Sequence, residues 1–351
     1  LSISGSGSMS SYYDASPAPW ADYSDTICTV TVGAGVTSIG AKAFSHCERF
    51  TAITLPDSLT RIGKSAFDSC TGLTSITLPD SLSSIGEQAF IGCGSLPNIA
   101  LPDSLTSIGS SVFSGCTGLT SVTLPAGLSS IEDTMFYGCT GLTSVVFPDG
   151  LTSIGWWAFN GCTGLTSITL PSGLTNLGAG AFAGTGITAF VSESDEFTVD
   201  EDGAVYDTSN SLIAYPAGNP QTVYVIQAGT KAIEEEAFAG AAHLAAVMVP
   251  DSVVSIGYNA FYSMAELESV YFFGDAPSGS GEFERKAGQL LKIYHAAGAN
   301  GWTEENWPSQ YFELIEWNPY AVTGVELDAE TLTLPLGKTQ KLVATVLPEW
   351  A

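Results

Sequence analysis

Basic residues are scarce in this sequence. Its 351 residues include 10 Lys and Arg against 36 Asp and Glu, which gives a formal net charge of -26. No basic residue lies between Lys64 and Lys231. Nucleic acids and anionic membrane surfaces are bound through clustered Lys and Arg. The sequence therefore predicts that neither is a partner.

Long apolar runs and catalytic motifs are also missing. No apolar run approaches the roughly 20 residues of a transmembrane helix, so we expect no membrane insertion in this segment. The three histidines, His46, His243 and His295, stand in no metal or nucleophile motif, and the seven cysteines contain no C-x-x-C pair. No Gly-x-Ser-x-Gly occurs in a strand-turn-helix setting. The sequence predicts no enzyme, no catalytic residue, no metal and no cofactor.

A repeat of 23 residues dominates what is present. Its Cys, Phe and Pro positions recur at this step: Cys47, Cys70, Cys93, Cys116, Cys139 and Cys162; Phe44, Phe67, Phe90, Phe113, Phe136, Phe159 and Phe182; Pro56, Pro79, Pro102, Pro125, Pro148 and Pro171. The chain is 45% hydrophobic, enough to bury a large core despite its charge. Such units are stable only when stacked on one another.

One unit, residues 73–93, shows the expected geometry. Residues 73–78 have the L-x-x-L-x-L spacing of a leucine-rich repeat strand, which Pro79 ends because proline lacks an N–H. Residues 82–86 form a second extended segment and a Gly corner, and residues 89–93 read as one helical turn. The fold class is a leucine-rich repeat solenoid: a right-handed coil of short parallel strands with one-turn helices, about nine coils and roughly 45 Å long.

The repeat motifs Ile-Gly-x-x-Ala-Phe-x-x-Cys and Leu-Thr-Ser-Ile-Thr-Leu-Pro resemble the 23-residue leucine-rich repeats of the BspA-like family of bacterial surface proteins, over residues 27 to 275. The resemblance implies a secreted or cell-surface location. It also implies a non-catalytic protein-binding module for adhesion or host interaction, with extracellular or host proteins as partners and glycans as a further class. We expect a monomer.

The array is interrupted once. After Phe182, residues 197–199 and 204–206 flank an Asp202-Gly203 turn and predict a hairpin. The expected division is 1–35, N-terminal cap and first strand; 36–190, leucine-rich repeats; 191–220, hairpin insert; 221–275, further repeats; 276–320, C-terminal cap; 321–351, truncated domain. This last segment resembles the start of a bacterial immunoglobulin-like domain. Such a sandwich needs about seven strands, so we expect a longer parent chain.

The cysteines and a cluster of acidic residues could suggest redox or metal chemistry, but their spacing does not support it. The six cysteines in register are expected to be buried, inert thiols, because neighbours one strand spacing apart fit a disulfide poorly. Cys28 falls at an outward strand position and is expected to be partly exposed. Acidic residues cluster at 193–207, where a solvated hairpin is favoured over a calcium site because the ligand spacing of a calcium loop is absent.

The surface supplies the candidate site. Outward strand positions carry short hydroxyl side chains, which form either a binding face or a stabilising ladder. Trp156 and Trp157 replace small or polar residues of other coils and lie near Tyr137; they form either a recognition patch or a contact with a neighbouring module. The candidate ligand-binding residues are Trp156, Trp157, Tyr137, Thr120, Thr123, Thr143, Thr166 and Thr169. The alternatives to a protein-binding module are a structural surface spacer and a carbohydrate-binding accessory module.

Overall fold

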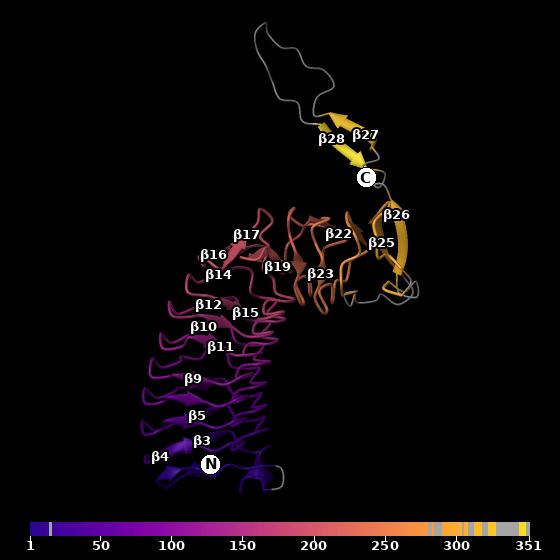
Figure 1. Cartoon of the computed structure of the whole chain (residues 1–351). Coiled ribbons are helices and arrows are strands. Elements are labelled where there is room, and N and C mark those ends of the chain that lie inside the picture. Colours follow the sequence, from indigo (N-terminus) through magenta and orange to yellow (C-terminus); the bar gives the residue numbers. More distant parts are fainter. Residues whose placement is uncertain are drawn as a thin grey trace.

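The protein is a solenoid of stacked coils that bends once (Figure 1). A computed structural model describes residues 1–13, 16–279, 283, 290–303, 305–307 and 312–317, and the backbone alone of 322–327 and 344–348. Short strands from successive coils pair in parallel, as the repeat predicts. The leucine-rich repeat solenoid is thus confirmed, with almost no helix.

The N-terminal stack has two columns of strands, one for each extended segment of the coil. The first column contains β1 (Ser2–Ile3), β3 (Thr29–Val32), β5 (Ala52–Thr54), β7 (Ser75–Ile76), β10 (Ser121–Thr123), β12 (Ser144–Val146), β14 (Ile168–Leu170) and β16 (Phe190–Ser192). The second contains β2 (Gly7–Ser8), β4 (Val36–Ile39), β6 (Arg61–Ile62), β8 (Ser84–Ile85), β9 (Ser107–Ile108), β11 (Ser130–Ile131), β13 (Ser153–Ile154) and β15 (Asn176–Leu177). Paired residues such as Ser121 and Ser144 are one repeat apart in sequence.

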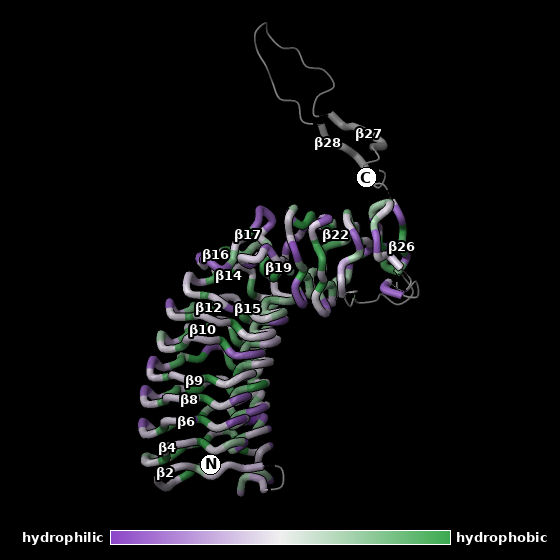
Figure 2. The backbone as a smooth tube through the Cα atoms, in the orientation of Figure 1, coloured by the Kyte–Doolittle hydropathy of each residue, from purple (hydrophilic) through white to green (hydrophobic). Residues whose placement is uncertain are grey.

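A column of phenylalanines runs through the core of this stack. From Phe44 to Phe182, consecutive rings are stacked with centroids 5.1 to 5.8 Å apart. Trp20, which precedes the 3₁₀ helix η1 (Ala21–Tyr23), stacks on Phe44 at 5.7 Å and covers the open end of the column. Figure 2 shows hydrophobic residues following the middle of the coils and hydrophilic residues gathered at the outer loops.

The expected one-turn helix is wrong. The segment from Gly86 to Cys93, and its equivalent in each coil, is called the turn segment. In it, every second N–H bonds within its own coil, as from Cys93 to the Phe90 carbonyl at 3.2 Å. The alternate N–H groups bond to the next coil, as from Phe90 to the Val112 carbonyl at 3.0 Å. Two residues per coil have a left-handed backbone, here Gln88 with φ 59° and Gly92 with φ 71°. An α-helix would use all these donors internally and leave the coils unpaired.

The cysteine ladder is buried as predicted, and no cysteine among the described residues forms a disulfide. Five of its thiols donate to the phenylalanine carbonyl of the preceding coil, for example Cys93 Sγ to the Phe67 oxygen at 3.2 Å. The thiol therefore adds a bond between coils while filling the volume of a small apolar residue. Cys28 lies outside the ladder and is exposed, also as predicted.

An insert separates the two stacks. It contains β17 (Phe197–Val199) and β18 (Val205–Asp207), which pair antiparallel, and β19 (Ser211–Ala214). Along β18, Val205 packs in the core of the N-terminal stack and Tyr206 in the core of the next stack. Because successive strand residues face opposite sides, the strand forms a wedge between two cores. The solenoid bends at this wedge, and we call the junction from β16 to β19 the elbow (Figure 1).

The C-terminal stack continues the repeat beyond the elbow. Its strands are β20 (Val223–Val225), β21 (Ala232–Ile233), β22 (Ala246–Val249), β23 (Ser255–Ile256), β24 (Ser269–Phe272), β25 (Leu291–Ala296) and β26 (Phe312–Trp317). β27 (Val322–Leu327) and β28 (Ala344–Pro348) pair antiparallel. Most of the predicted immunoglobulin-like segment and parts of the C-terminal cap lie outside the described residues. The domain boundaries and that segment stay predictions.

Candidate functional site

The two stacks form a groove at the elbow. Tyr137, Trp157 and Asn160 line it from turn segments of the N-terminal stack, and Glu236, Asn259 and Tyr262 from those of the C-terminal stack. We call this cavity, of about 450 Å³, the elbow groove. Because its two walls belong to separate stacks, the groove exists only where the insert bends the solenoid.

A hydrogen bond joins the two walls. The indole N–H of Trp157 donates to Glu236 Oε2 at 2.5 Å, across 79 residues of sequence. Glu236 is only 7% exposed. Burial raises the pKa of its carboxyl, the bond from Trp157 acts in the opposite direction, and the negative charge of Glu235 raises it further. The site therefore holds a buried carboxyl group beside an oriented indole ring.

Two glycines allow the stacks to approach this closely. The Gly184 N–H bonds to the Ala239 carbonyl at 3.2 Å. A Cβ added to Gly240 would lie 2.5 Å from the Gly184 nitrogen and 2.6 Å from its Cα. Gly240 also has φ +77°, which side chains rarely adopt. The width of the groove thus depends on close backbone contact at its floor.

Trp157 has a backbone conformation that disfavours it. Its φ is 53°, in the left-handed region, at a position that is Gly180 in the next coil. A bulky residue there is uncommon and costs about 1 to 2 kcal/mol relative to glycine. The same position is left-handed in each coil from Lys42 to Gly180, so this strain belongs to the repeat. What distinguishes Trp157 is the bond from its indole N–H to Glu236.

The structure brings only part of the predicted site together. Tyr137 and Trp157 line the elbow groove, whereas Trp156 is 62% exposed outside it. Trp156 still lies on the same turn segment, and its backbone N–H is held by Asp133 Oδ1 at 2.8 Å. None of the five candidate threonines lines the groove. Their role in binding stays a prediction.

The threonine face has a structural use. Thr120 Oγ1 donates to the Pro97 carbonyl, and Thr143 Oγ1 to the Thr120 carbonyl, each at 3.0 Å. The same bond recurs at Thr51 and Thr74. These hydroxyls therefore link successive coils. All five candidate threonines are nevertheless exposed, and Thr123 and Thr169 lie within strands β10 and β14.

Further exposed aromatic side chains lie on the same turn segments as the groove residues. The aromatic band comprises five exposed residues on turn segments on both sides of the elbow: Tyr137, Trp156, Trp157, Tyr258 and Tyr262. Large exposed aromatic side chains in a group mark interaction surfaces. Three of the five line the groove, and Trp156 and Tyr258 directly precede the groove residues Trp157 and Asn259 in sequence.

The site residues missed from the sequence share a detectable signal. Tyr262 directly follows Phe261, as Tyr137 follows Phe136, and both lie in the same part of the coil. Glu236 has the left-handed backbone of the Trp157 position, with φ 58°. Counting positions from the recurring Phe of each coil would have aligned them. It would not have shown that they face one another, because that depends on the bend.

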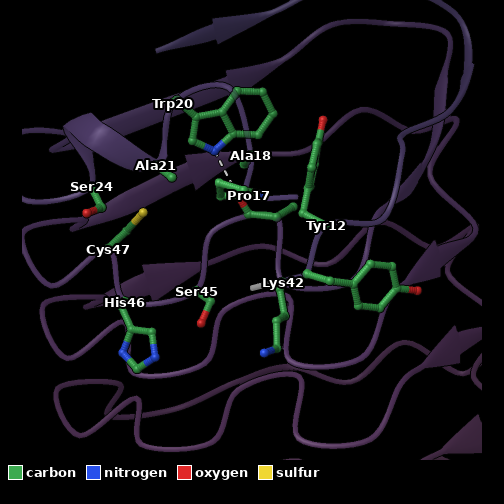
Figure 3. A pocket seen from close by; sticks show the side chains of 12 residues that line it. Tyr12, Pro17, Ala18, Trp20, Ala21, Ser24, Lys42, Ser45, His46 and Cys47 are labelled. Atoms are coloured by element: carbon green, nitrogen blue, oxygen red, sulfur yellow. Dashed lines mark hydrogen bonds between the residues drawn. The ribbon is translucent and has the colours of Figure 1, made fainter. Parts of the chain in front are cut away.

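Two other cavities are less suited to a ligand. One of about 150 Å³ lies beside Tyr12, Trp20, Lys42 and His46 at the N-terminal end (Figure 3). There the Trp20 indole donates to the Ala43 carbonyl at 2.7 Å and serves to cover the core. Another, of about 510 Å³, lies between the loops after β22, β24 and β25 and has a largely small-residue lining. Neither combines exposed aromatic rings with a buried charged group.

The acidic cluster supports the hairpin. Asp200 Oδ1 accepts the N–H groups of Asp202 and Ala204, and Asp200 Oδ2 accepts the Tyr224 hydroxyl. Asp207 similarly accepts the N–H groups of Ser209 and Ser211. The bonds to the N–H groups are those of tight turns, whereas the Tyr224 bond links the hairpin to β20. Throughout the described residues, no three His, Cys, Asp or Glu side chains are placed to hold a metal ion.

The fold and this site define a leucine-rich repeat solenoid with an aromatic groove at its elbow. The chain belongs to the BspA type leucine rich repeat family, whose model matches six copies within residues 23–139, 84–210 and 218–282. Within the described residues, η1 is the sole helix, and nothing helical reaches the length and hydrophobicity of a membrane span.

Solved structures show the same likeness. A leucine rich cell surface protein from Faecalibacterium prausnitzii is 30% identical, with a TM-score of 0.63 and coverage of 78% of this chain and 82% of that protein. A leucine-rich repeat protein from Bacteroides ovatus is 26% identical, with a TM-score of 0.49 and coverage of 83% and 84%. No curated protein matches the chain.

Proposed function

We propose that this chain is a non-catalytic protein-binding module of a bacterial cell surface and that it contacts its partner at the elbow. The aromatic band carries this proposal, because it gathers exposed tryptophan and tyrosine side chains around a groove. Family membership and the cell-surface relative support the location. Adhesion to extracellular or host proteins is the use that fits such a module.

The test is capture of extracellular-matrix, mucin and plasma proteins by the whole immobilised chain. The double variant Trp156→Ser with Trp157→Ser removes two rings of the band. Its control is Glu87→Ser with Gln88→Ser, at the corresponding positions of a coil far from the elbow. We expect the first variant to lose the captured proteins and the second to keep them. Equal capture by all three proteins would contradict a role for the elbow.

A carbohydrate-binding module is the second candidate. Asn160 and Asn259 line the groove beside the aromatic rings, and rings with nearby amides suit the apolar faces and hydroxyls of a sugar. A glycan array separates the two candidates. Saturable glycan binding that the Trp156/Trp157 variant abolishes would favour the second.

A further inference from the structure

The elbow groove contains a buried carboxylate without a counter-ion. Glu236 accepts a bond from the neutral Trp157 indole and forms no ion pair within the described part of the chain. The neighbouring charge is the carboxylate of Glu235, which adds repulsion. A buried charge is costly unless it is paired. A cation that entered the groove would relieve this cost.

The walls of the groove suit a planar organic cation. Tyr137, Trp157 and Tyr262 line it, and aromatic rings attract cations that lie over their faces. The Trp157 ring is held by its bond to Glu236 and passes over Gly180, so little motion needs to be frozen on binding. A guanidinium group can stack on an aromatic ring while it donates to a carboxylate, which a single ammonium does less well.

The distribution of charge in the chain also favours a cation in the groove. The N-terminal wall lies within the long segment from Lys64 to Lys231 that contains no Lys or Arg, and the chain as a whole has a net charge of -26. No residue of the groove lining is basic. A positively charged side chain is therefore steered toward this surface and meets no like charge in the groove.

We propose that the elbow groove receives an arginine side chain of a partner protein, with its guanidinium on the aromatic walls and bonded to Glu236. The volume of about 450 Å³ exceeds that of one side chain. Asn160 and Asn259 also line the groove, and in this proposal their amides bond to the backbone next to the arginine. This assignment rests on the proposed protein-binding function and adds the chemistry of the contact.

The test titrates the whole chain with three probes: N-acetyl-arginine amide, the neutral isostere N-acetyl-citrulline amide, and triacetylchitotriose. Calorimetry and tryptophan fluorescence measure binding. We expect the arginine probe to bind saturably with a Kd on the order of 1 mM, and citrulline to bind at least about tenfold more weakly. Equal binding of the two amides, no saturable binding of arginine, or binding of the trisaccharide alone would overturn the proposal.

Two variants locate the binding. Glu236→Gln keeps the side-chain volume and an oxygen for the Trp157 bond, and we expect it to weaken the arginine probe by about tenfold. Trp157→Gly places the residue that the backbone prefers and should abolish binding. Thr134→Gly, at the same coil position outside the groove, is the control and should bind as the unmodified chain does. Unchanged binding by Glu236→Gln would also overturn the proposal.

Failure of this assignment can be told from failure of the proposed function. Arginine amide, added in excess, should release proteins captured by the immobilised chain, whereas citrulline amide should not. If capture depends on Trp156 and Trp157 but neither amide releases the proteins, the arginine assignment is wrong and the protein-binding function stands. If capture itself does not depend on the elbow, the proposed function is wrong.

Discussion

Single residues with a left-handed backbone conformation determine the geometry of each coil. Each coil from Lys42 to Gly180 places one such residue at the Gln88 position, including Ser65 with φ 52°, Thr134 with φ 54° and Gly180 with φ 60°. Each non-glycine residue there costs free energy that glycine avoids. The 23-residue spacing alone gave no sign of this conformation, because the same buried positions fit a helical turn.

We predict that a protein with glycine at this position is more stable than one with alanine, the reverse of the usual order of stability. Gln88→Ala should unfold with about 1 kcal/mol less free energy than Gln88→Gly, because alanine keeps the left-handed strain. At the exposed strand residue Ser107, alanine should instead be the more stable substituent. Denaturant unfolding measures both pairs. The same order at both sites would show that the left-handed backbone is absent.

The buried thiols should be unreactive in the folded protein. Burial raises the pKa of Cys47 to about 11 and that of Cys139 to about 12, and raises those of the other four ladder cysteines. At pH 8, about one Cys47 thiol in a thousand is then the reactive thiolate. Thiol titration at pH 8 should label Cys28 alone until denaturant is added. Rapid labelling of several thiols in the native protein contradicts this burial.

The same shifts set the alkaline stability. The folded pKa values lie above the ordinary value of 9.0, so the folded state retains protons that the unfolded state loses above that pH. The stability is fully present below pH 9 and declines as the pH rises toward 11. Denaturant midpoints measured from pH 8 to 10.5 should fall steadily. A flat profile would mean that the thiols are solvated in the folded state.

At the scale of elements, contacts between coils decide the structure. The turn segments share their donors between their own coil and the next, so a turn cannot fold without its neighbour. The sequence predicted the strand pairing for this reason, since a fixed repeat length is also a fixed register. It missed the pairing of the turns because hydrogen-bond donors have no signature in the hydrophobic pattern.

The backbone contact between the two stacks at Gly184 and Gly240 should tolerate no added volume. Gly240→Ala inserts a methyl group against the Gly184 backbone, and we expect it to cost about 2 kcal/mol more than Gly138→Ala. Gly138 is the matched control, since its φ is +67° and nothing lies within 4 Å of an added Cβ. The free energies of unfolding measure the difference. Equal costs would mean that the stacks do not touch there.

At the scale of the whole molecule, the bend creates the candidate site. The sequence identified Trp157 because it departs from the repeat and Tyr137 because it lies near it in the preceding coil, and it located the hairpin from its turn residues. It did not identify Glu236 or Tyr262, because their positions opposite Trp157 follow from how β18 wedges two cores apart. That geometry is a property of tertiary packing across 79 residues, which no local pattern records.

The most direct test of the elbow as the binding surface is hydrogen–deuterium exchange of the whole chain, free and with a captured partner. We predict that protection appears in the turn segments that carry the aromatic band, on both sides of the elbow, while the strand face exchanges as in the free protein. Protection confined to the strand face around Thr123 and Thr169, with none at the elbow, would contradict the account.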